Sequence, residues 1–152
     1  MKPHPGPYLI KSYPASPGAV PRARRALTDF AAAAGATGEQ LDEIRLAVSE
    51  ALTNVVLHAY AEEAGHIYLT AAVTTGELWV LIADDGRGIQ AHGDTAGLGV
   101  GLALIAYASD ELALVRRASG GTEVRMRFEL GAAEPDRDRQ PRGSVSSATS
   151  PA

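Results

Sequence analysis

Apolar and polar residues alternate over residues 8–13, and this period of two predicts a short β-strand. Further stretches rich in apolar and β-branched residues predict four more strands, at residues 66–74, 77–84, 111–116 and 122–130. Short turns at Thr75-Gly76 and Ser119-Gly120-Gly121 join these strands in pairs. The pattern therefore predicts five strands, four of them in two hairpins.

Three helices are predicted between the strands. The first spans residues 17–34, with proline near its start and Gly35 at its end. The second begins at a capping box formed by Thr37 and Gln40 and runs to about residue 59. The third follows a polar loop over residues 85–96 and runs from about residue 98 to 108. Because helices and strands interleave without strict βαβ alternation, we predict a two-layer α/β sandwich: a mixed, largely antiparallel sheet with helices on one face.

The 152 residues suggest one folded domain, which we place at residues 8–130. Residues 1–7 are rich in proline, and residues 131–152 are polar and rich in Pro, Ser, Arg and Asp, so we expect both ends to be disordered. The formal net charge of −4 argues against a nucleic-acid partner. Cysteine is absent, and no apolar run resembles a signal peptide or a membrane span, so we expect a cytoplasmic protein.

Polar residues follow one face of the second predicted helix. Glu50, Asn54 and His58 are spaced by four residues and share that face, beside apolar neighbours. A carboxylate on a partly apolar surface suits proton abstraction. An amide oxygen one turn away suits Mg²⁺, which prefers oxygen ligands. For an isolated pair of this kind, an exposed Glu and a hydrated Asn are the more common explanation.

An almost continuous apolar strand ends abruptly in Asp84-Asp85-Gly86-Arg87-Gly88. An ordinary turn would explain these residues without any ligand. The functional interpretation is that Asp84 accepts a hydrogen bond from the exocyclic amine of adenine. Gly86 and Gly88 would then let the backbone approach the purine, because they carry no β-carbon.

A glycine-rich segment, Gly97-Leu98-Gly99-Val100-Gly101-Leu102, opens the third predicted helix. Free N–H groups and the helix dipole at such a start favour an anion, which indicates a phosphate site. A hinge with close helix packing is the alternative. The spacing fits neither the dinucleotide-binding fingerprint nor a P-loop.

Together the three motifs resemble those of the Bergerat-fold (GHKL) ATPases, the superfamily shared by gyrase, Hsp90, histidine kinases and MutL. The stretch over residues 48–60 is similar to the motif helix of one branch, the anti-sigma-factor serine/threonine kinases. Asp84 to Gly88 match the family's D-x-G-x-G, and residues 97–102 match its second glycine box. Gly121-Thr122 matches a position near adenine. The resemblance covers about residues 8–130.

The resemblance implies a function and a set of roles. Glu50 would act as general base on a substrate serine hydroxyl, and Asn54 would hold Mg²⁺. Asp84 would select the adenine of ATP, with Gly88 and Thr122 beside it. The phosphates would bind at Gly97, Leu98, Gly99, Val100 and Gly101. The partners would be a STAS-domain anti-sigma factor antagonist and a sigma factor, and members of this branch commonly form homodimers.

One departure concerns the segment between the glycine motifs. Residues 89–96 are fewer than in related kinases and include no Lys or Arg, although transfer of a phosphoryl group normally needs a cation besides Mg²⁺. Arg87, Arg22 or Arg25 could supply it. An ATP-binding interaction module with little turnover is therefore the alternative function. A histidine-kinase catalytic domain is disfavoured because residues 1–35 are too short for a dimerising hairpin.

Overall fold

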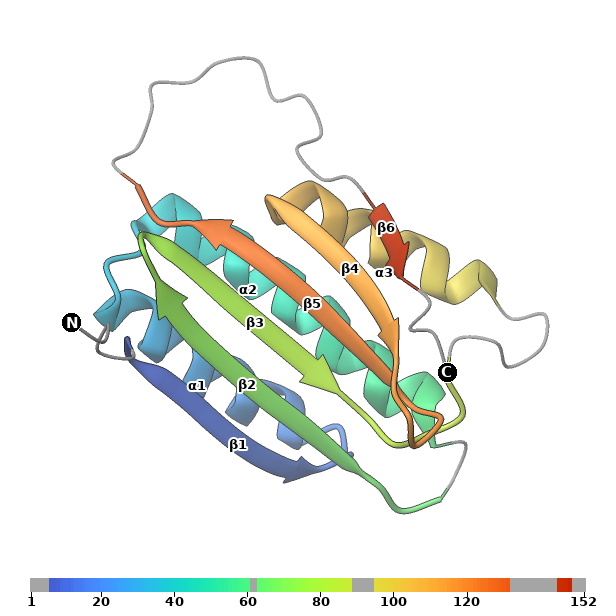
Figure 1. Cartoon of the computed structure of the whole chain (residues 1–152). Helices are drawn as coiled ribbons and strands as arrows, with labels where there is room; N and C mark the ends of the chain where they lie inside the picture. The colour runs from blue at the N-terminus through green and yellow to red at the C-terminus, as the bar shows by residue number, and fades with distance from the viewer. Residues whose placement is uncertain (1–5, 61–62, 89–94, 132–144, 149–152) are drawn as a thin grey trace.

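A six-stranded sheet forms the front layer of the molecule (Figure 1). The computed structural model describes residues 6–60, 63–88, 95–131 and 145–148. The strands lie in the order β1-β2-β3-β5-β4-β6. Their bounds are Tyr8–Pro14 (β1), His66–Thr74 (β2), Glu77–Ala83 (β3), Glu111–Arg116 (β4), Thr122–Glu129 (β5) and Val145–Ala148 (β6). All neighbouring strands are antiparallel except β4 and β6, which are parallel.

Three helices form the second layer, behind the sheet in Figure 1. They are α1 (Ala19–Ala33), α2 (Gly38–Asn54) and α3 (Thr95–Ala108), and a π-helical turn, η1 (Val55–Ala59), continues α2. Gly35 follows α1 with φ +99°, a conformation that favours glycine. The capping box is present: Gln40 N–H donates to Thr37 Oγ1 at 3.4 Å, and Thr37 N–H donates to Gln40 Oε1 at 2.9 Å. The predicted two-layer α/β sandwich, mixed sheet and helical caps are confirmed.

The core lies between the two layers. It follows from the alternation of side chains along each strand and from the 3.6-residue repeat of each helix. Alternate residues of the central strands, such as Leu78, Val80 and Ile82 of β3, are fully buried on the helix side. Ile44 and Val48, spaced by one helical turn, are fully buried on the sheet side of α2. Burying aliphatic side chains stabilises the fold by roughly 1.5–3 kcal/mol each. This packing fixes the orientation of α2 and therefore the direction of its polar face.

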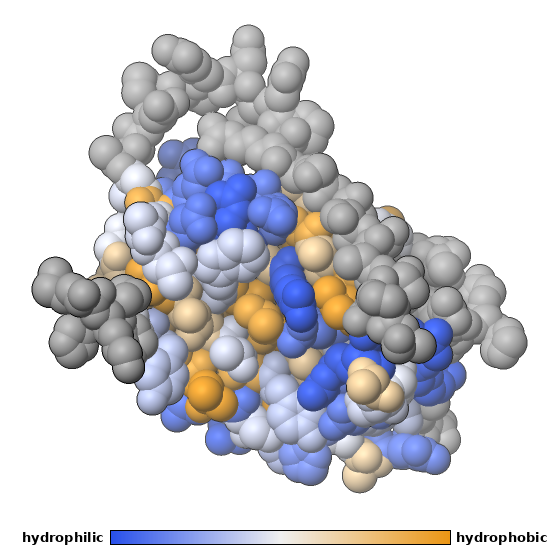
Figure 2. Space-filling model, viewed as in Figure 1, coloured by the Kyte–Doolittle hydropathy of each residue, from blue (hydrophilic) through white to orange (hydrophobic). Residues whose placement is uncertain are grey.

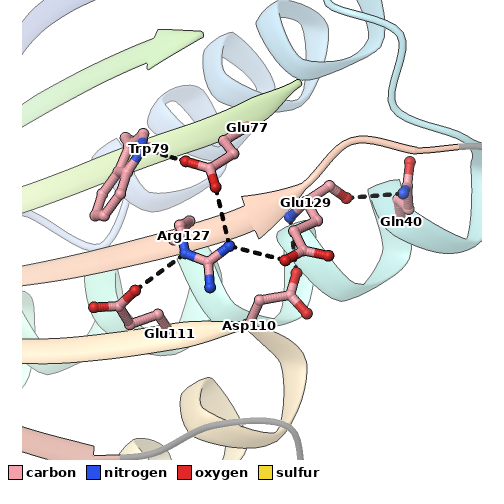
Figure 3. Close-up of polar contacts among 7 residues, drawn as sticks. All are labelled: Gln40, Glu77, Trp79, Asp110, Glu111, Arg127 and Glu129. Atoms are coloured by element: carbon pink, nitrogen blue, oxygen red, sulfur yellow. Dashed lines mark hydrogen bonds and ion pairs between the residues drawn. The ribbon is translucent and has the colours of Figure 1, made fainter. Parts of the chain in front are cut away.

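No helix among the described residues covers the opposite face of the sheet, which carries a mixed surface (Figure 2). Tyr8 and Ile10 of β1 are each 68% exposed there. Trp79 lies on this face, partly buried, and its indole N–H donates to Glu77 at 3.2 Å (Figure 3). Its neighbours Leu78 and Val80 take the buried positions because a strand alternates its side chains.

An ion-pair network lies at the end of the sheet where β3 begins (Figure 3). Arg127 of β5 contacts three carboxylates, those of Glu77, Glu111 and Glu129, at 3.3, 3.1 and 3.1 Å. Hydrogen bonding to Glu129 and Glu111 raises the pKa of Arg127. Gln40 donates to the Glu129 carbonyl at 3.0 Å and so ties the start of α2 to the same end.

Two parts of the chain differ most from the sequence prediction. Helix α3 begins at Thr95, three residues before the predicted start. Residues 145–148 form β6 beside β4, so the prediction of a disordered tail is wrong for these four residues. An exposed strand edge offers unpaired backbone groups to any extended segment, which local composition does not reveal. Within the described residues, no helix combines the length and apolar character needed to cross a membrane.

Candidate functional site

The predicted catalytic pair converges on helix α3. Glu50 and Asn54 project from α2 toward Gly101, which is buried. A β-carbon at residue 101 would lie 3.2 Å from Oε2 of Glu50 and 3.3 Å from both amide atoms of Asn54. The carboxylate and the amide therefore lie within 3.4 Å of one point, as the four-residue spacing predicts. Glycine at 101 leaves room for both groups, since a β-carbon there would crowd each of them.

A pocket opens beside this pair, between α2, α3 and the sheet. Asn54 and His58 line it from the helix side, whereas Asp84, Gly88 and Thr122 line it from the sheet side. The remaining lining residues are apolar: Ala51, Val55, Ala59, Leu102, Leu114 and Val124. A mostly apolar cleft with a few placed polar groups is typical of a small-molecule or cofactor site. The structure thus brings Asn54, Asp84, Gly88 and Thr122, far apart in sequence, to one cavity.

Asp84 is the buried acid of this pocket, with 6% of its surface exposed. Its Oδ1 accepts the N–H of Gly86 at 2.9 Å and the N–H of Thr122 at 3.4 Å. Burial raises the pKa of Asp84, although the hydrogen bonds from Gly86 and Thr122 oppose this shift. Both backbone donors bond to Oδ1, so no hydrogen bond within the described part of the chain occupies Oδ2. A ligand amine would find an acceptor there.

The glycines of the strand-end motif have structural reasons for their presence. Gly88 has φ +72°, and a β-carbon there would lie 2.7 Å from the carbonyl oxygen of Gly120. A β-carbon at Gly86 would collide with the carbonyl of Ala59, at the end of the motif helix. Gly86 is thus required by close packing against η1, a role that differs from the predicted approach of its backbone to a purine. Gly88 lines the pocket beside Thr122, and its predicted place next to adenine stays a prediction.

The π-helical turn η1 connects the motif helix to the strand-end motif. The N–H of Arg87 donates to the carbonyl of Ala59 at 2.8 Å, and its guanidinium donates to the carbonyl of His58 at 3.1 Å. These bonds satisfy carbonyls that a helix end leaves open. π-helical turns often occur at functional sites. Here the turn holds residues 84–88 against the end of α2 and closes one side of the pocket.

The second glycine box lies within the first two turns of α3. Because α3 begins at Thr95, the N–H groups free of intrahelical bonds belong to residues 95–98, which include Gly97 and Leu98. Gly99 and Val100 lie one and two residues further in, and Val100 is 67% exposed. A β-carbon at Gly99 would meet no atom within 4 Å. The predicted phosphate contacts of this segment stay predictions, and this helix start favours Gly97 and Leu98 for them.

Two of the three arginines considered as the additional cation have other contacts. The Arg22 guanidinium lies 5.6 Å from the centre of the Tyr13 ring, and Arg87 is bonded to His58. Arg25 is exposed. Most of the intervening segment, residues 89–94, lies outside the described residues. In the part of the chain that the structure describes, no group of three or more His, Cys, Asp or Glu could hold a metal ion.

Several polar residues beside the pocket were missed from the sequence. Arg117 donates to the Asp84 carbonyl oxygen at 3.2 Å and to the Asp85 carboxylate at 2.8 Å. Ser119 donates to the same Asp85 oxygen at 2.8 Å, and Tyr60 accepts the N–H of Asp85 at 2.9 Å. A pair of arginines at a strand end and a serine in a turn match no motif. Only the fold brings them to the strand-end motif.

Comparisons with known proteins agree with this geometry. The family model of the histidine kinase-like ATPase domain matches residues 13–128. The anti-sigma F factor of Caldanaerobacter subterraneus is 30% identical over 120 residues, which cover 72% of this chain and 84% of that protein. The serine-protein kinase RsbW of Bacillus licheniformis is 33% identical over 93 residues, covering 60% of this chain and 58% of that protein.

A solved structure shares the fold. The crystal structure of the RsbU and RsbW domains of a Mycobacterium tuberculosis protein superposes with a TM-score of 0.67 at 25% sequence identity. The match covers 95% of this chain and 36% of the other, so this chain spans about a third of that protein. The family model covers most of the folded chain, including the helix that carries Glu50 and the strand that ends at Asp84. This chain belongs to the histidine kinase-like ATPase family.

Proposed function

We propose that the protein is an ATP-dependent serine/threonine kinase that phosphorylates a STAS-type anti-sigma factor antagonist and sequesters a sigma factor. The observation that carries the proposal is the convergence of the Glu50 carboxylate and the Asn54 amide on the glycine backbone of α3. The names of the relatives, an anti-sigma F factor and a serine-protein kinase, support the same assignment. Such a kinase would act in the cytoplasm, where its partners bind the transcription machinery.

The residues present fit Mg-ATP. Asn54 offers one oxygen ligand beside a glycine, which suits a Mg²⁺ ion that takes its other ligands from phosphate and water. The bound Mg²⁺ would neutralise negative charge on the phosphates. Asp84 would accept the adenine amine at the apolar end of the pocket, with Gly88 and Thr122 beside the ring. The phosphates would extend past Asn54 toward the start of α3.

The chemical role of Glu50 follows from its position. Its carboxylate would accept the proton of the substrate hydroxyl, whose oxygen forms a bond to the γ-phosphorus. The bond between the γ-phosphorus and the bridging oxygen breaks, and ADP leaves with that oxygen. Glu50 is only partly buried, so the hydroxyl of a partner protein could reach it from outside. The products are phosphoserine and ADP.

The uncovered sheet face supports a homodimer. Tyr8 and Ile10 are exposed there, and Trp79 is partly buried. Groups of apolar residues lie between polar ones on this face in Figure 2. Association of two copies through it would leave the pocket accessible, because the pocket lies on the helix side of the sheet. Exposed apolar patches on otherwise polar surfaces commonly mark protein interfaces.

The test is phosphoryl transfer to a purified STAS-domain protein from the same genome. With Mg-ATP, mass spectrometry should detect one phosphoserine on the partner. Glu50→Gln should abolish transfer and keep Mg-ATP binding in calorimetry, whereas Glu63→Gln, at an exposed position, should behave as the wild type. Absence of ATP binding by the wild-type protein would refute the proposal.

The second candidate is an ATP-binding interaction module with little turnover. Arg22 contacts Tyr13 and Arg87 contacts His58, so neither contact brings a cation to Glu50 or Asn54. This arrangement favours a protein that binds ATP and transfers phosphate poorly. This alternative predicts that ATP binds, that no STAS partner is phosphorylated, and that Glu50→Gln leaves partner binding intact. The same two measurements, calorimetry and mass spectrometry, therefore separate the two functions.

A further inference from the structure

Asp85, next to the predicted adenine-binding acid, is the centre of a polar cluster. Its carboxylate oxygen Oδ1 accepts hydrogen bonds from Arg117 and Ser119, each at 2.8 Å. Its N–H donates to the hydroxyl of Tyr60 at 2.9 Å, and that hydroxyl donates to the carbonyl of His66 at 2.6 Å. We name Asp85, Arg117, Ser119 and Tyr60 the Asp85 clamp. It joins η1, the end of β3 and the β4–β5 turn.

Arg117 also bonds directly to the backbone of Asp84. Its guanidinium donates to the Asp84 carbonyl oxygen at 3.2 Å and lies 5.2 Å from the centre of the Tyr68 ring. The planar Arg117 side chain thus contacts three groups: the Asp84 carbonyl, the Asp85 carboxylate and the face of the Tyr68 ring. The fixed fork of a guanidinium suits such a multiple contact better than an ammonium group does.

The surrounding backbone leaves this segment little freedom. Gly121 packs so closely on Asp84 that a β-carbon there would collide with the Asp84 carbonyl, and Gly86 is similarly close to Ala59. The Asp84 N–H donates to the Thr122 carbonyl at 2.9 Å. The segment is therefore fixed on the pocket side by its backbone and on the outer side by the Asp85 clamp.

The electrostatics of the cluster agree with the geometry. The hydrogen bond from Ser119 lowers the pKa of Asp85, and the charge of Arg117 adds to this effect. Asp85 thus remains a carboxylate acceptor. The Arg117 and Asp85 side chains are 32% and 40% exposed, so their ion pair adds little to overall stability. A network of small stabilising value beside a ligand-binding acid suggests a role in orientation.

We infer that Arg117, held by Asp85 and Ser119, is a positioning residue that sets the direction of the Asp84 carboxylate and thereby the selectivity for adenine over other bases. The inference rests on the proposed ATP-binding function. Asp84 Oδ1 is used by backbone donors, so a small rotation of this segment would redirect Oδ2, the atom left for the adenine amine. Guanine has a carbonyl at the corresponding ring position and would not donate to it.

The test compares nucleotide binding by the full-length protein and its variants. Calorimetry with ATP and GTP, each with Mg²⁺, gives a selectivity ratio for each protein. Arg117→Ala should weaken ATP binding about tenfold and GTP binding much less, so that the ratio falls. Arg125→Ala removes an exposed arginine of β5 that does not line the pocket and pairs with Glu123, so it should leave both affinities unchanged.

Further variants separate positioning from folding. Ser119→Ala and Asp85→Asn should each lower the ATP:GTP ratio, and combining Asp85→Asn with Arg117→Ala should add little to the single effects. Arg117→Lys should restore part of the ratio. If Arg117→Ala unfolds the protein, the other two single variants still decide the matter.

The outcomes are distinguishable. A wild-type protein that binds no ATP refutes the proposed function and this inference together. A wild-type protein that prefers ATP, with Arg117, Ser119 and Asp85 variants that keep the same ratio, refutes the inference alone. Equal weakening of ATP and GTP binding would also overturn it, because a general loss of pocket structure produces that result.

Discussion

Gly101 of α3 faces the carboxylate of Glu50 so closely that a β-carbon at residue 101 would lie 3.2 Å from Oε2. This distance is shorter than an ordinary contact, so the helix approaches the proposed general base as nearly as a residue without a side chain allows. The same backbone lies beside Asn54. Glycine therefore has a steric role here in addition to the predicted phosphate binding.

Gly101→Ala should weaken Mg-ATP binding and change the stability of the protein little. Alanine favours a helix over glycine by about 1 kcal/mol, which offsets the crowding, so the free energy of unfolding should change little. Mg-ATP affinity should fall by about tenfold or more, because the added methyl group enters the space between Glu50 and Asn54. Urea denaturation and calorimetry give the two quantities.

Gly99→Ala is the stability control for this substitution. Its β-carbon would meet no atom within 4 Å, so this variant should gain the helix-propensity term without crowding. Unchanged Mg-ATP binding by Gly101→Ala would show that the methyl group is tolerated and would contradict the steric role of Gly101.

Asp84→Asn should weaken ATP binding and change how the stability of the protein depends on pH. Burial raises the pKa of Asp84 above its ordinary value of 3.8. The folded chain therefore keeps this proton at pH values where the unfolded chain has released it, and the residue's contribution to stability falls as the pH rises through that interval. Asparagine has no such titration, and its side-chain oxygen can still accept the N–H groups of Gly86 and Thr122.

The Asp84→Asn variant should accordingly be at least as stable as the wild type at neutral pH. Its advantage in stability over the wild type should become smaller as the pH falls toward 4. ATP affinity should drop by about tenfold or more, because asparagine then presents an NH2 donor, in place of an acceptor oxygen, to the adenine amine. Urea denaturation at several pH values tests the first expectation, and calorimetry tests the second. A variant that is destabilised yet binds ATP normally would contradict both.

Arg127→Ala should destabilise the sheet in a salt-dependent way. Arg127 bridges three glutamates, so its removal leaves Glu77, Glu111 and Glu129 near one another without the shared cation. We expect a loss of about 1 kcal/mol at low ionic strength and a smaller loss in 1 M salt. Arg125→Ala, which removes a single exposed pair with Glu123, is the control and should have less effect. A loss independent of salt would indicate packing as the cause.

Truncation after Gly131 should uncover the edge of β4. In the full chain, residues 145–148 pair in parallel with Leu112–Val115 of β4. Without them, hydrogen exchange measured by mass spectrometry should become faster in β4 and stay unchanged in β2, which lies between two other strands. Equal exchange of β4 in both proteins would show that the pairing does not persist in solution.

Most of the fold could be predicted because its signals are local. The strand alternation, the Thr37–Gln40 capping box and Gly35 after α1 each depend on a few neighbouring residues. The spacing of Glu50 and Asn54 likewise fixes their common face through the geometry of a single helix. The start of α3 was predicted three residues too late, and the strand at residues 145–148 was missed, because its formation depends on an available sheet edge.

The sequence by itself determined the two layers, the shared face of Glu50 and Asn54, and the place of Asp84 at the end of a buried strand. Only the tertiary structure decided that Gly101 lies beside Glu50 and Asn54, that Gly86 is required by η1, and that Arg117 reaches Asp85 across 32 residues. The reason is physical: periodicity and capping act within a few residues, whereas strand register and helix packing decide which distant groups touch.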